Sequence, residues 1–160
     1  MSQVEPLFIE ETLKDEFWIM SMHEELNQFK RNDVCELVAY SKNMDNIDTK
    51  WVFKNKLVEH GLITRNKAKL VAKDYNQQED IDFGETYAQV ARLEVFRLQL
   101  AYAYVMNFKL YQMDVKSSFL NGYIEEKVYV SPPPRFEDHK NPNHVYKLKK
   151  TLYGLKQAPR

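Results

Sequence analysis

Two strand-like runs that follow one another closely constrain the fold of this chain more than any other feature. Residues 51–58 (WVFKNKLV) and 62–73 (LITRNKAKLVAK) are separated by a short polar segment that contains Gly61. We predict a β-hairpin that turns at this glycine. Alternation in the second run places three lysines on one face and three apolar side chains on the other: Lys67, Lys69 and Lys73 against Ala68, Leu70 and Ala72.

Helical and extended patterns surround the predicted hairpin. Apolar residues recur at helical spacing over residues 12–30, where Thr12 and Asp15 are spaced for a capping box, and again over residues 91–106. Shorter extended runs are predicted at 127–131 and 144–154. The pattern indicates one α+β domain with helices packed on an antiparallel sheet.

A lone carboxylate falls at the end of a further predicted strand, residues 108–115. Tyr111, Met113 and Val115 alternate as one apolar face, and Asp114 lies on the other face. Two interpretations follow from these residues. Asp114 is either a surface residue of a half-exposed strand or a metal ligand that depends on groups elsewhere in the chain.

Formal charge is segregated along the chain, although the net charge is zero. Residues 1–36 carry nine acids and three bases, whereas residues 51–73 carry six bases and one acid. Residues 139–160 carry six bases and no acid. Two basic runs of this size are typical either of solvated surfaces or of contacts with a polyanion such as a nucleic acid.

Several kinds of site are excluded or disfavoured by the sequence. The four glycines are dispersed, so no glycine-rich phosphate loop is present. Cys35 is alone, which excludes a disulfide or a cysteine-based zinc site within the chain. No apolar run approaches membrane-spanning length, and no signal peptide is evident at the N-terminus, so we expect no membrane partner and an intracellular, cytoplasmic location.

Four segments, in order, resemble the reverse transcriptase of copia-type LTR retrotransposons: KWVFKNKL, KAKLVAKDYNQQEDIDFGETYAQVARLE, YQMDVKSSFLNGYIEEKVYV and VYKLKKTLYGLKQAPR. The resemblance extends over nearly the whole chain. It implies a partial right-hand polymerase, with fingers and the start of the palm built around an antiparallel sheet. In this layout, residues 1–40 are a helical lead-in, residues 41–85 and 120–152 are fingers-like, and residues 86–119 and 153–160 are palm-like.

The resemblance also assigns a catalytic role to the lone carboxylate. Asp114 matches the first catalytic aspartate, which with the Val115 carbonyl would hold Mg²⁺ or Mn²⁺ in the intact parent, while no metal is firmly expected for this chain alone. Such metals activate the primer hydroxyl and stabilise the leaving pyrophosphate. Phe119 matches the bulky residue that excludes a ribose 2′-hydroxyl. Ser117 and Ser118 would lie beneath the incoming triphosphate.

The lysines of the hairpin and the last glycine complete the implied substrate contacts. Lys67 and Lys69 would contact nucleotide phosphates, and the sequence leaves open which one matches the principal ligand of the family. Tyr153 and Gly154 resemble the loop that borders the nucleotide. Basic residues would contact the nucleic-acid backbone at seven further positions: Lys54, Lys56, Lys73, Lys147, Lys149, Lys150 and Lys156.

The chain departs from the family pattern at several positions. Asp74, Asp80 and Arg135 stand where glycine is common, Gln89 replaces proline and Cys35 replaces tryptophan. Where glycine is required for positive φ, an aspartate or arginine is costly. By the resemblance, two further catalytic aspartates would lie beyond the end of this sequence.

Three hypotheses follow. The chain is part of a retrotransposon polyprotein whose intact parent copies an RNA template into DNA from deoxynucleoside triphosphates. Alternatively, it is a non-catalytic nucleic-acid-binding remnant that retains affinity for RNA–DNA hybrids, or it is a protein-interaction module or an inactive product of a degenerate element. In the first hypothesis, the remainder of the polyprotein is a partner and the intact element is particle-associated.

Overall fold

The computed structural model gives an order of helices and strands that matches the α+β pattern. It describes all residues except 43, 81, 85, 87–91, 114–117, 138–139 and 159–160. Of residues 76, 118 and 119, it describes only the backbone. The elements are α1 (Ile9–Thr12), α2 (Glu16–Arg31), β1 (Cys35–Ala39), β2 (Asn46–Ile47), β3 (Thr49–Leu57), β4 (Ile63–Ala72), η1 (Asp74–Asn76), α3 (Leu93–Met106), η2 (Ser118–Asn121), β5 (Tyr129–Val130) and β6 (His144–Leu148).

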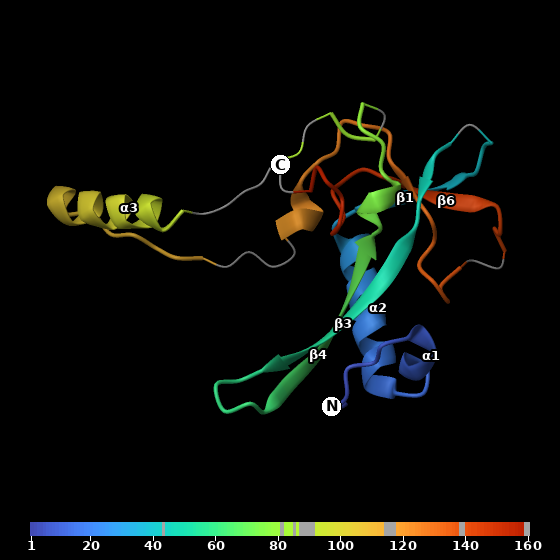
Figure 1. Ribbon diagram of the computed structural model, residues 1–160, viewed down its shortest axis with the longest axis horizontal. Helices are drawn as coiled ribbons and strands as arrows, with labels where there is room; N and C mark the ends of the chain where they lie inside the picture. Colours follow the sequence, from blue (N-terminus) through green and yellow to red (C-terminus); the bar gives the residue numbers. More distant parts are fainter. Residues whose placement is uncertain are drawn as a thin grey trace.

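The predicted hairpin is confirmed and is the longest sheet element of the structure. β3 and β4 pair antiparallel, and the connection contains Gly61 with a φ of 75°. Figure 1 shows the far end of this hairpin projecting beyond α2. Ala68, Leu70 and Ala72 are buried on one face, as the alternation predicts.

The first long helix begins later than predicted. α2 begins after Asp15, whose carboxylate accepts a hydrogen bond from the Phe17 N–H over 2.9 Å. Thr12 instead ends the short helix α1, because the extended backbone of Asp15 (φ −125°, ψ 112°) separates the two helices. The prediction of one helix with a Thr12 capping box is therefore wrong, and Asp15 is the N-cap.

The second sheet is mixed rather than wholly antiparallel. Its strand order is β1-β6-β5-β2, in which β1–β6 and β6–β5 are antiparallel and β2–β5 is parallel. β5 is only two residues long, and the prolines at 132–134 follow closely after it. Because proline has no amide N–H, these residues cannot extend the strand pairing.

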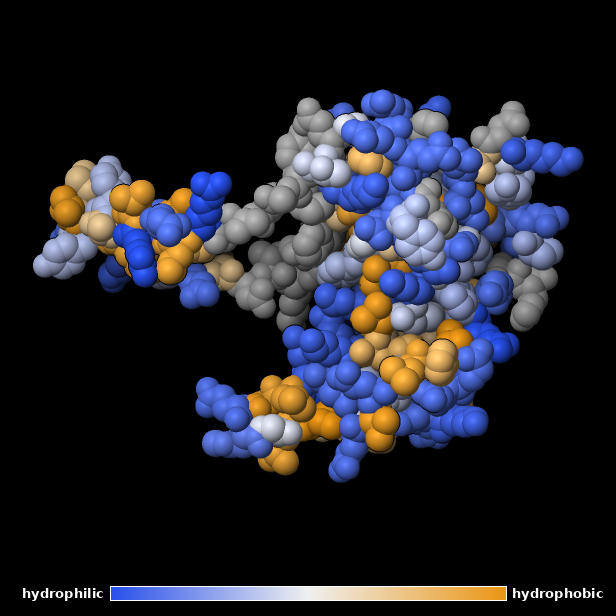
Figure 2. Space-filling model, in the orientation of Figure 1, coloured by the Kyte–Doolittle hydropathy of each residue, from blue (hydrophilic) through white to orange (hydrophobic). Residues whose placement is uncertain are grey.

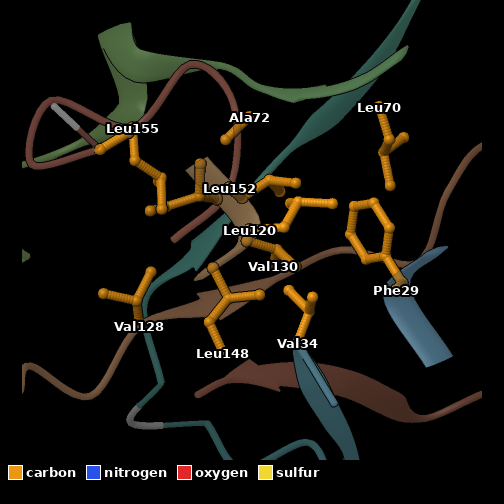
Figure 3. Packing of buried hydrophobic residues seen from close by; sticks show 12 residues of the cluster. Phe29, Val34, Leu70, Ala72, Leu120, Val128, Val130, Leu148, Leu152 and Leu155 are labelled. Carbon is orange, nitrogen blue, oxygen red and sulfur yellow. The ribbon is translucent and has the colours of Figure 1, made fainter. Parts of the chain in front are cut away.

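The hydrophobic core joins the hairpin, α2 and the second sheet. Figure 3 shows these side chains converging from strands, helices and the C-terminal segment. The C-terminal segment contributes Leu152, which is completely buried, and Leu155, which is 3% exposed. The remaining core residues are Phe29, Val34, Ile47, Leu70, Ala72, Leu120, Val128, Val130, Leu148 and Ala158. The core therefore fixes the C-terminal segment against the base of the hairpin.

The region between the hairpin and η2 differs from the prediction in its packing. A helix is present as predicted, yet in α3 only Ala103 is buried. Residues 108–113 form no strand, so the strand predicted at 108–115 is wrong over these residues, while 114 and 115 lie outside the described part of the chain. Tyr111 and Met113 are exposed. No described strand pairs with this segment, and an unpaired run has no ladder hydrogen bonds to define it as a strand.

Two of the three positions where the family commonly has glycine adopt a left-handed backbone. Asp80 has a φ of 65° and Arg135 has a φ of 68°. Asp74 instead begins η1 and is not among the residues with positive φ. The structure therefore retains glycine-like geometry at two sites occupied by residues with a Cβ atom, which is unfavourable, and less so for aspartate than for arginine.

Among the helices that the structure describes, none has the length and apolar character needed to cross a membrane.

Candidate phosphate-binding site

One face of the hairpin gathers cations directly opposite one another. The strand register pairs Lys54 with Lys67 and Lys56 with Arg65. Like charges at directly opposed positions destabilise an antiparallel pair. Lys69, opposite Val52, lies on the same face. This arrangement is unfavourable in isolation, and a bound polyanion would relieve it.

The cations of this face differ in whether an acid neutralises them. Arg65 forms an ion pair with Glu24 of α2. Within the part of the chain that the structure describes, Lys54, Lys56 and Lys67 have no ion-pair partner. Their charge is therefore available to an external anion.

The cationic face ends in an apolar tip. Leu57, Val58 and Leu62, at the turn of the hairpin, are 60%, 44% and 69% exposed. Figure 2 shows apolar surface at this end of the hairpin, beside hydrophilic surface. The lysines are thus confined to the strands between the tip and the body of the protein.

The two segments predicted to contact the nucleotide lie together at the base of the hairpin. Lys69 Nζ lies 4.3 Å from the centroid of the Tyr153 ring, which places the cation over the face of the aromatic ring. The Ala72 N–H donates to the Tyr153 carbonyl oxygen over 2.8 Å. The structure therefore brings predicted residues of β4 and of the C-terminal segment into one site.

Gly154 allows this close approach. Its φ is 89°, and a Cβ atom at this position would collide with the Ala72 carbonyl oxygen and lie 2.6 Å from Val71 Cγ1. Only glycine both adopts this backbone conformation without strain and leaves room for the neighbouring strand. The contact between the Tyr153–Gly154 segment and β4 thus depends on the absence of a Cβ atom in glycine.

A buried amide network holds the C-terminal segment in place. Gln77 Nε2 donates to Gln157 Oε1 over 2.9 Å, and Gln77 Oε1 accepts from the Lys156 N–H over 2.8 Å. Gln157 Nε2 in turn donates to the Asp82 carbonyl oxygen over 2.9 Å. The Lys156 ammonium lies 4.6 Å from the centroid of the Phe83 ring. The segment after β4 therefore positions the backbone around Gly154 through satisfied, buried hydrogen bonds.

A buried carboxylate that the sequence analysis did not single out lies beside these lysines. Glu25 of α2 is 8% exposed, and its Oε1 atom is buried with no hydrogen-bond partner among the described residues. Burial raises the pKa of Glu25, whereas the charges of Lys67 and Lys69 oppose the rise. One signal could have identified this residue: Glu25 falls on the helical stripe of Trp18, Met22 and Phe29, where an acid is unexpected.

The cation and the ring at the base of the hairpin also have altered acidities. Burial lowers the pKa of Lys69, neighbouring Lys67 lowers it further, and Glu25 opposes both. Burial raises the pKa of Tyr153, and the Glu25 charge adds to this rise. Glu25, Lys69 and Tyr153 therefore form one electrostatic cluster.

The second basic run is largely neutralised by acids from the N-terminal part of the chain. Lys147 pairs with Glu36 at 3.3 Å, and Lys149 pairs with Asp33 at 3.2 Å and with Glu36 at 3.5 Å. A hydrogen bond with Asp33 is the main cause that raises the pKa of Lys149. Lys150 Nζ instead lies 5.2 Å from the centroid of the Tyr123 ring. This run offers less free charge than the hairpin does.

Lys73, predicted to contact the nucleic acid, lies at the end of β4 and pairs with Asp48 at 3.4 Å. Its charge is therefore partly neutralised, unlike that of Lys54 and Lys56.

The predicted metal ligands lie outside the described residues. Asp114, Val115 and Ser117 fall in the gap at 114–117, and only the backbone of Ser118 and Phe119, in η2, is described. Apart from the gaps named above, no group of three or more histidine, cysteine, aspartate or glutamate side chains is placed to hold a metal. The proposed metal roles of Asp114 and Val115 therefore stay predictions.

Comparisons with known proteins agree with the sequence pattern. A family model described as reverse transcriptase (RNA-dependent DNA polymerase) matches residues 32–160. The chain is 39% identical over 160 residues to the retrovirus-related Pol polyprotein from transposon RE1 of Arabidopsis thaliana, an alignment that covers 99% of the chain and 11% of that polyprotein. It is 36% identical over 157 residues to the Pol polyprotein from transposon RE2 of the same plant, with 98% and 11% covered.

A third similar protein comes from tobacco. The chain is 39% identical over 140 residues to the retrovirus-related Pol polyprotein from transposon TNT 1-94 of Nicotiana tabacum, which covers 88% of the chain and 10% of that polyprotein. No solved structure matches the chain at a significant level. The chain thus spans only about a tenth of the length of these polyproteins.

Proposed function

The chain belongs to the copia-type reverse transcriptase (RNA-dependent DNA polymerase) family, and from this membership we propose that its hairpin is the surface that holds the phosphates of nucleotide and nucleic acid during DNA synthesis. The observation that carries the proposal is the two pairs of opposed cations on β3 and β4, Lys54 with Lys67 and Lys56 with Arg65. A phosphate backbone supplies the negative charge that this face lacks.

The base of the hairpin is the part of this surface suited to a nucleotide triphosphate. Lys69 lies over the Tyr153 ring, and Lys67 stands on the same face of β4. Two cations at this point would neutralise charge on the phosphates while the backbone around Gly154 borders the substrate closely. Which lysine makes the principal contact stays open.

Template-directed polymerisation itself is proposed for the longer polyprotein. Asp114 and the Val115 carbonyl would hold Mg²⁺ or Mn²⁺ there, which supplies Lewis-acid stabilisation of the transferred phosphoryl group. In this chain, Lys67 and Lys69 would orient the triphosphate, and Phe119, Ser117 and Ser118 would surround the sugar and the phosphates. RNA template, RNA–DNA hybrid and deoxynucleoside triphosphates are the proposed partners, together with the remainder of the polyprotein.

A second candidate function is nucleic-acid binding without catalysis. One observation favours it for this chain: the cationic face is built entirely from β3 and β4, and its charge does not depend on Asp114. Phosphate contacts carry no base information, so such binding would be indifferent to sequence. Lys147 and Lys149 would contribute less, because Glu36 and Asp33 already pair with them, whereas Lys150 and Lys156 lie against aromatic rings, as Lys69 does.

The experiment is a fluorescence-anisotropy titration of a labelled RNA–DNA hybrid. Lys67→Glu combined with Lys69→Glu should abolish binding. The matched control, Lys109→Glu combined with Lys127→Glu, changes the net charge equally at two exposed lysines and should retain most of the affinity. Equal losses in both double variants would show that net charge, and not the hairpin face, determines binding, and would refute the proposal.

A further inference from the structure

A cavity of about 510 Å³ lies between α2, the second sheet and the segment that follows β5. Leu70 of β4 forms part of its wall. Because side chains alternate along a strand, Leu70 lies on the opposite face of β4 from Lys67 and Lys69. The cavity is therefore separate from the proposed phosphate-binding surface.

The inner walls of this cavity are apolar and partly aromatic. Some of the lining residues belong to the hydrophobic core and are at most 7% exposed: Phe29, Leu70, Val130 and Leu148. Phe136 and Tyr146 add two more aromatic rings, and the Phe136 ring lies edge-on to the His23 ring with 5.3 Å between the centroids. Aromatic rings prefer edge-to-face or offset contacts with a further ring. The lining therefore suits a flat aromatic ligand.

A small side chain forms the β1 side of the cavity. Cys35 begins β1, opposite Leu148 of β6, and is half-buried. Burial raises the pKa of its thiol to about 11, so the group is neutral at pH 7 and packs as a small apolar side chain. The family pattern has tryptophan at this position. β1 therefore presents a thiol to the cavity where an indole ring would otherwise extend into it.

The mouth of the cavity, unlike its walls, is polar. Those lining residues that are exposed all carry polar side chains: His23, Asn27, Lys30 and Asp33. Lys30 and Asp33 have opposite charges, so the mouth does not select a ligand of either sign. Hydrogen-bond acceptors are present there in the Asn27 amide and the Asp33 carboxylate. This distribution favours a neutral ligand with an apolar ring and one polar edge.

We propose that the cavity between α2 and the second sheet binds a neutral, flat aromatic ligand, whose ring occupies the space beside Cys35 that a tryptophan side chain would fill. A core relaxes only partly when a large side chain is replaced by a small one, so apolar volume remains. Apolar cavities of about 150 Å³ already bind benzene. The ring packs against Phe29, Phe136 and Tyr146, and its polar edge faces the mouth. This site goes beyond the proposed function, which concerns the opposite face of β4.

The test uses indole as the probe, titrated into the nitrogen-15-labelled chain and followed by amide proton–nitrogen correlation spectra. We expect saturable shifts of the amide signals around the cavity, with a dissociation constant of about 0.1–1 mM. Cys35→Trp places an indole ring inside the cavity, so it should remove these saturable shifts. Its free energy of unfolding should also rise, because the new ring fills apolar space.

A matched control lies on the same strand. Leu37 is 39% exposed and does not line the cavity. Leu37→Trp therefore adds the same ring to β1 without filling the site, and it should bind indole as the native chain does. A second variant, Leu26→Trp, fills the cavity from α2 and should weaken indole binding as Cys35→Trp does.

The outcomes distinguish this site from other apolar surface of the chain. Equal indole affinity in Cys35→Trp and Leu37→Trp would overturn the proposal, as would a native chain with no saturable shifts or with shifts confined to α3. Should Cys35→Trp fail to fold, an affinity of Leu26→Trp equal to that of the native chain would overturn it instead. Indole should leave the binding of the RNA–DNA hybrid unchanged, and displacement of the hybrid by indole would show that the site is not separate.

Discussion

Substitution of Gly154 by alanine tests the contact between β4 and the C-terminal segment. The new Cβ would collide with the Ala72 carbonyl oxygen and lie 2.6 Å from Val71 Cγ1, while the backbone has a φ of 89°. A left-handed backbone at a residue with a Cβ costs about 1–2 kcal/mol, and overpacking at a tight contact typically costs about 1–3 kcal/mol more. We therefore expect Gly154→Ala to lower the free energy of unfolding by about 2–5 kcal/mol.

Two other glycines provide the controls. Gly61 also has a positive φ, 75°, but no atom lies within 4 Å of its hypothetical Cβ, so Gly61→Ala isolates the backbone cost of about 1–2 kcal/mol. Gly84 has neither a positive φ nor a close neighbour, so Gly84→Ala should be nearly neutral. Urea unfolding followed by tryptophan fluorescence measures all three. If Gly154→Ala costs no more than Gly61→Ala, the close approach of the two segments is not what Gly154 provides.

Three further predictions concern charge and backbone strain. Arg135→Gly should have a free energy of unfolding about 1 kcal/mol higher than that of Arg135→Ala. Both variants lose the exposed ion pair with Glu10, but only glycine adopts the φ of 68° without strain. Equal stabilities of the two variants in urea would contradict this. Burial raises the pKa of Glu25 in the folded chain. Between the ordinary glutamate pKa and the raised one, the folded state therefore binds more protons than the unfolded state does, so the free energy of unfolding should fall as the pH rises through that window. Glu25→Gln should remove this fall, so it should be more stable than the native chain at pH 7 and no more stable below the ordinary glutamate pKa. If the free energies of unfolding of the two chains change with pH in parallel, Glu25 is not the group responsible. Lys54→Gln should stabilise the hairpin by about 0.2–1 kcal/mol at low salt, because it removes the charge opposite Lys67. If thermal melts show no increase in stability, or an increase that persists at high salt, the two lysines do not repel one another measurably.

Local periodicity was sufficient to predict the hairpin and the buried stripe of α2. Alternation of lysines with Ala68 and Leu70 defined two faces, and the structure buries the apolar one. Trp18 and Met22, one helical turn apart in the apolar pattern of residues 12–30, are both buried. These features follow from residues close in sequence, where a repeat of two or of 3.6 residues determines which side chains share a face.

Long-range pairing was beyond the reach of the sequence pattern. The second sheet joins β1 to β6 and β2 to β5 across most of the chain, and the parallel β2–β5 pair has only two residues on each strand. Residues 108–113 alternate as a strand would but find no partner among the described strands. Alternation therefore indicates which residues could form a strand, whereas strand pairing depends on whether the fold brings another extended segment next to them.

Runs of charge along the chain predicted the site only in part. The hairpin run does form a cationic face, but the C-terminal run is paired with Asp33 and Glu36 from the acidic N-terminal part. The N-terminal acids are thus part of the folded body, and Glu24 pairs with Arg65 of the hairpin itself. The segregation of charge along the sequence predicted two basic surfaces. In the described part of the folded chain, only the hairpin surface keeps largely unpaired charge.

The salt dependence of hybrid binding tests the central claim, that the β3–β4 face is the phosphate-binding surface. The logarithm of the association constant for a labelled RNA–DNA hybrid should fall linearly with the logarithm of salt concentration, with a slope that reflects the number of phosphates contacted. Lys54→Gln combined with Lys67→Gln should make this slope shallower by about 1.8. Lys147→Gln combined with Lys149→Gln should change it far less, because Glu36 and Asp33 already pair with those lysines. A larger change of slope in the second pair than in the first would contradict the account.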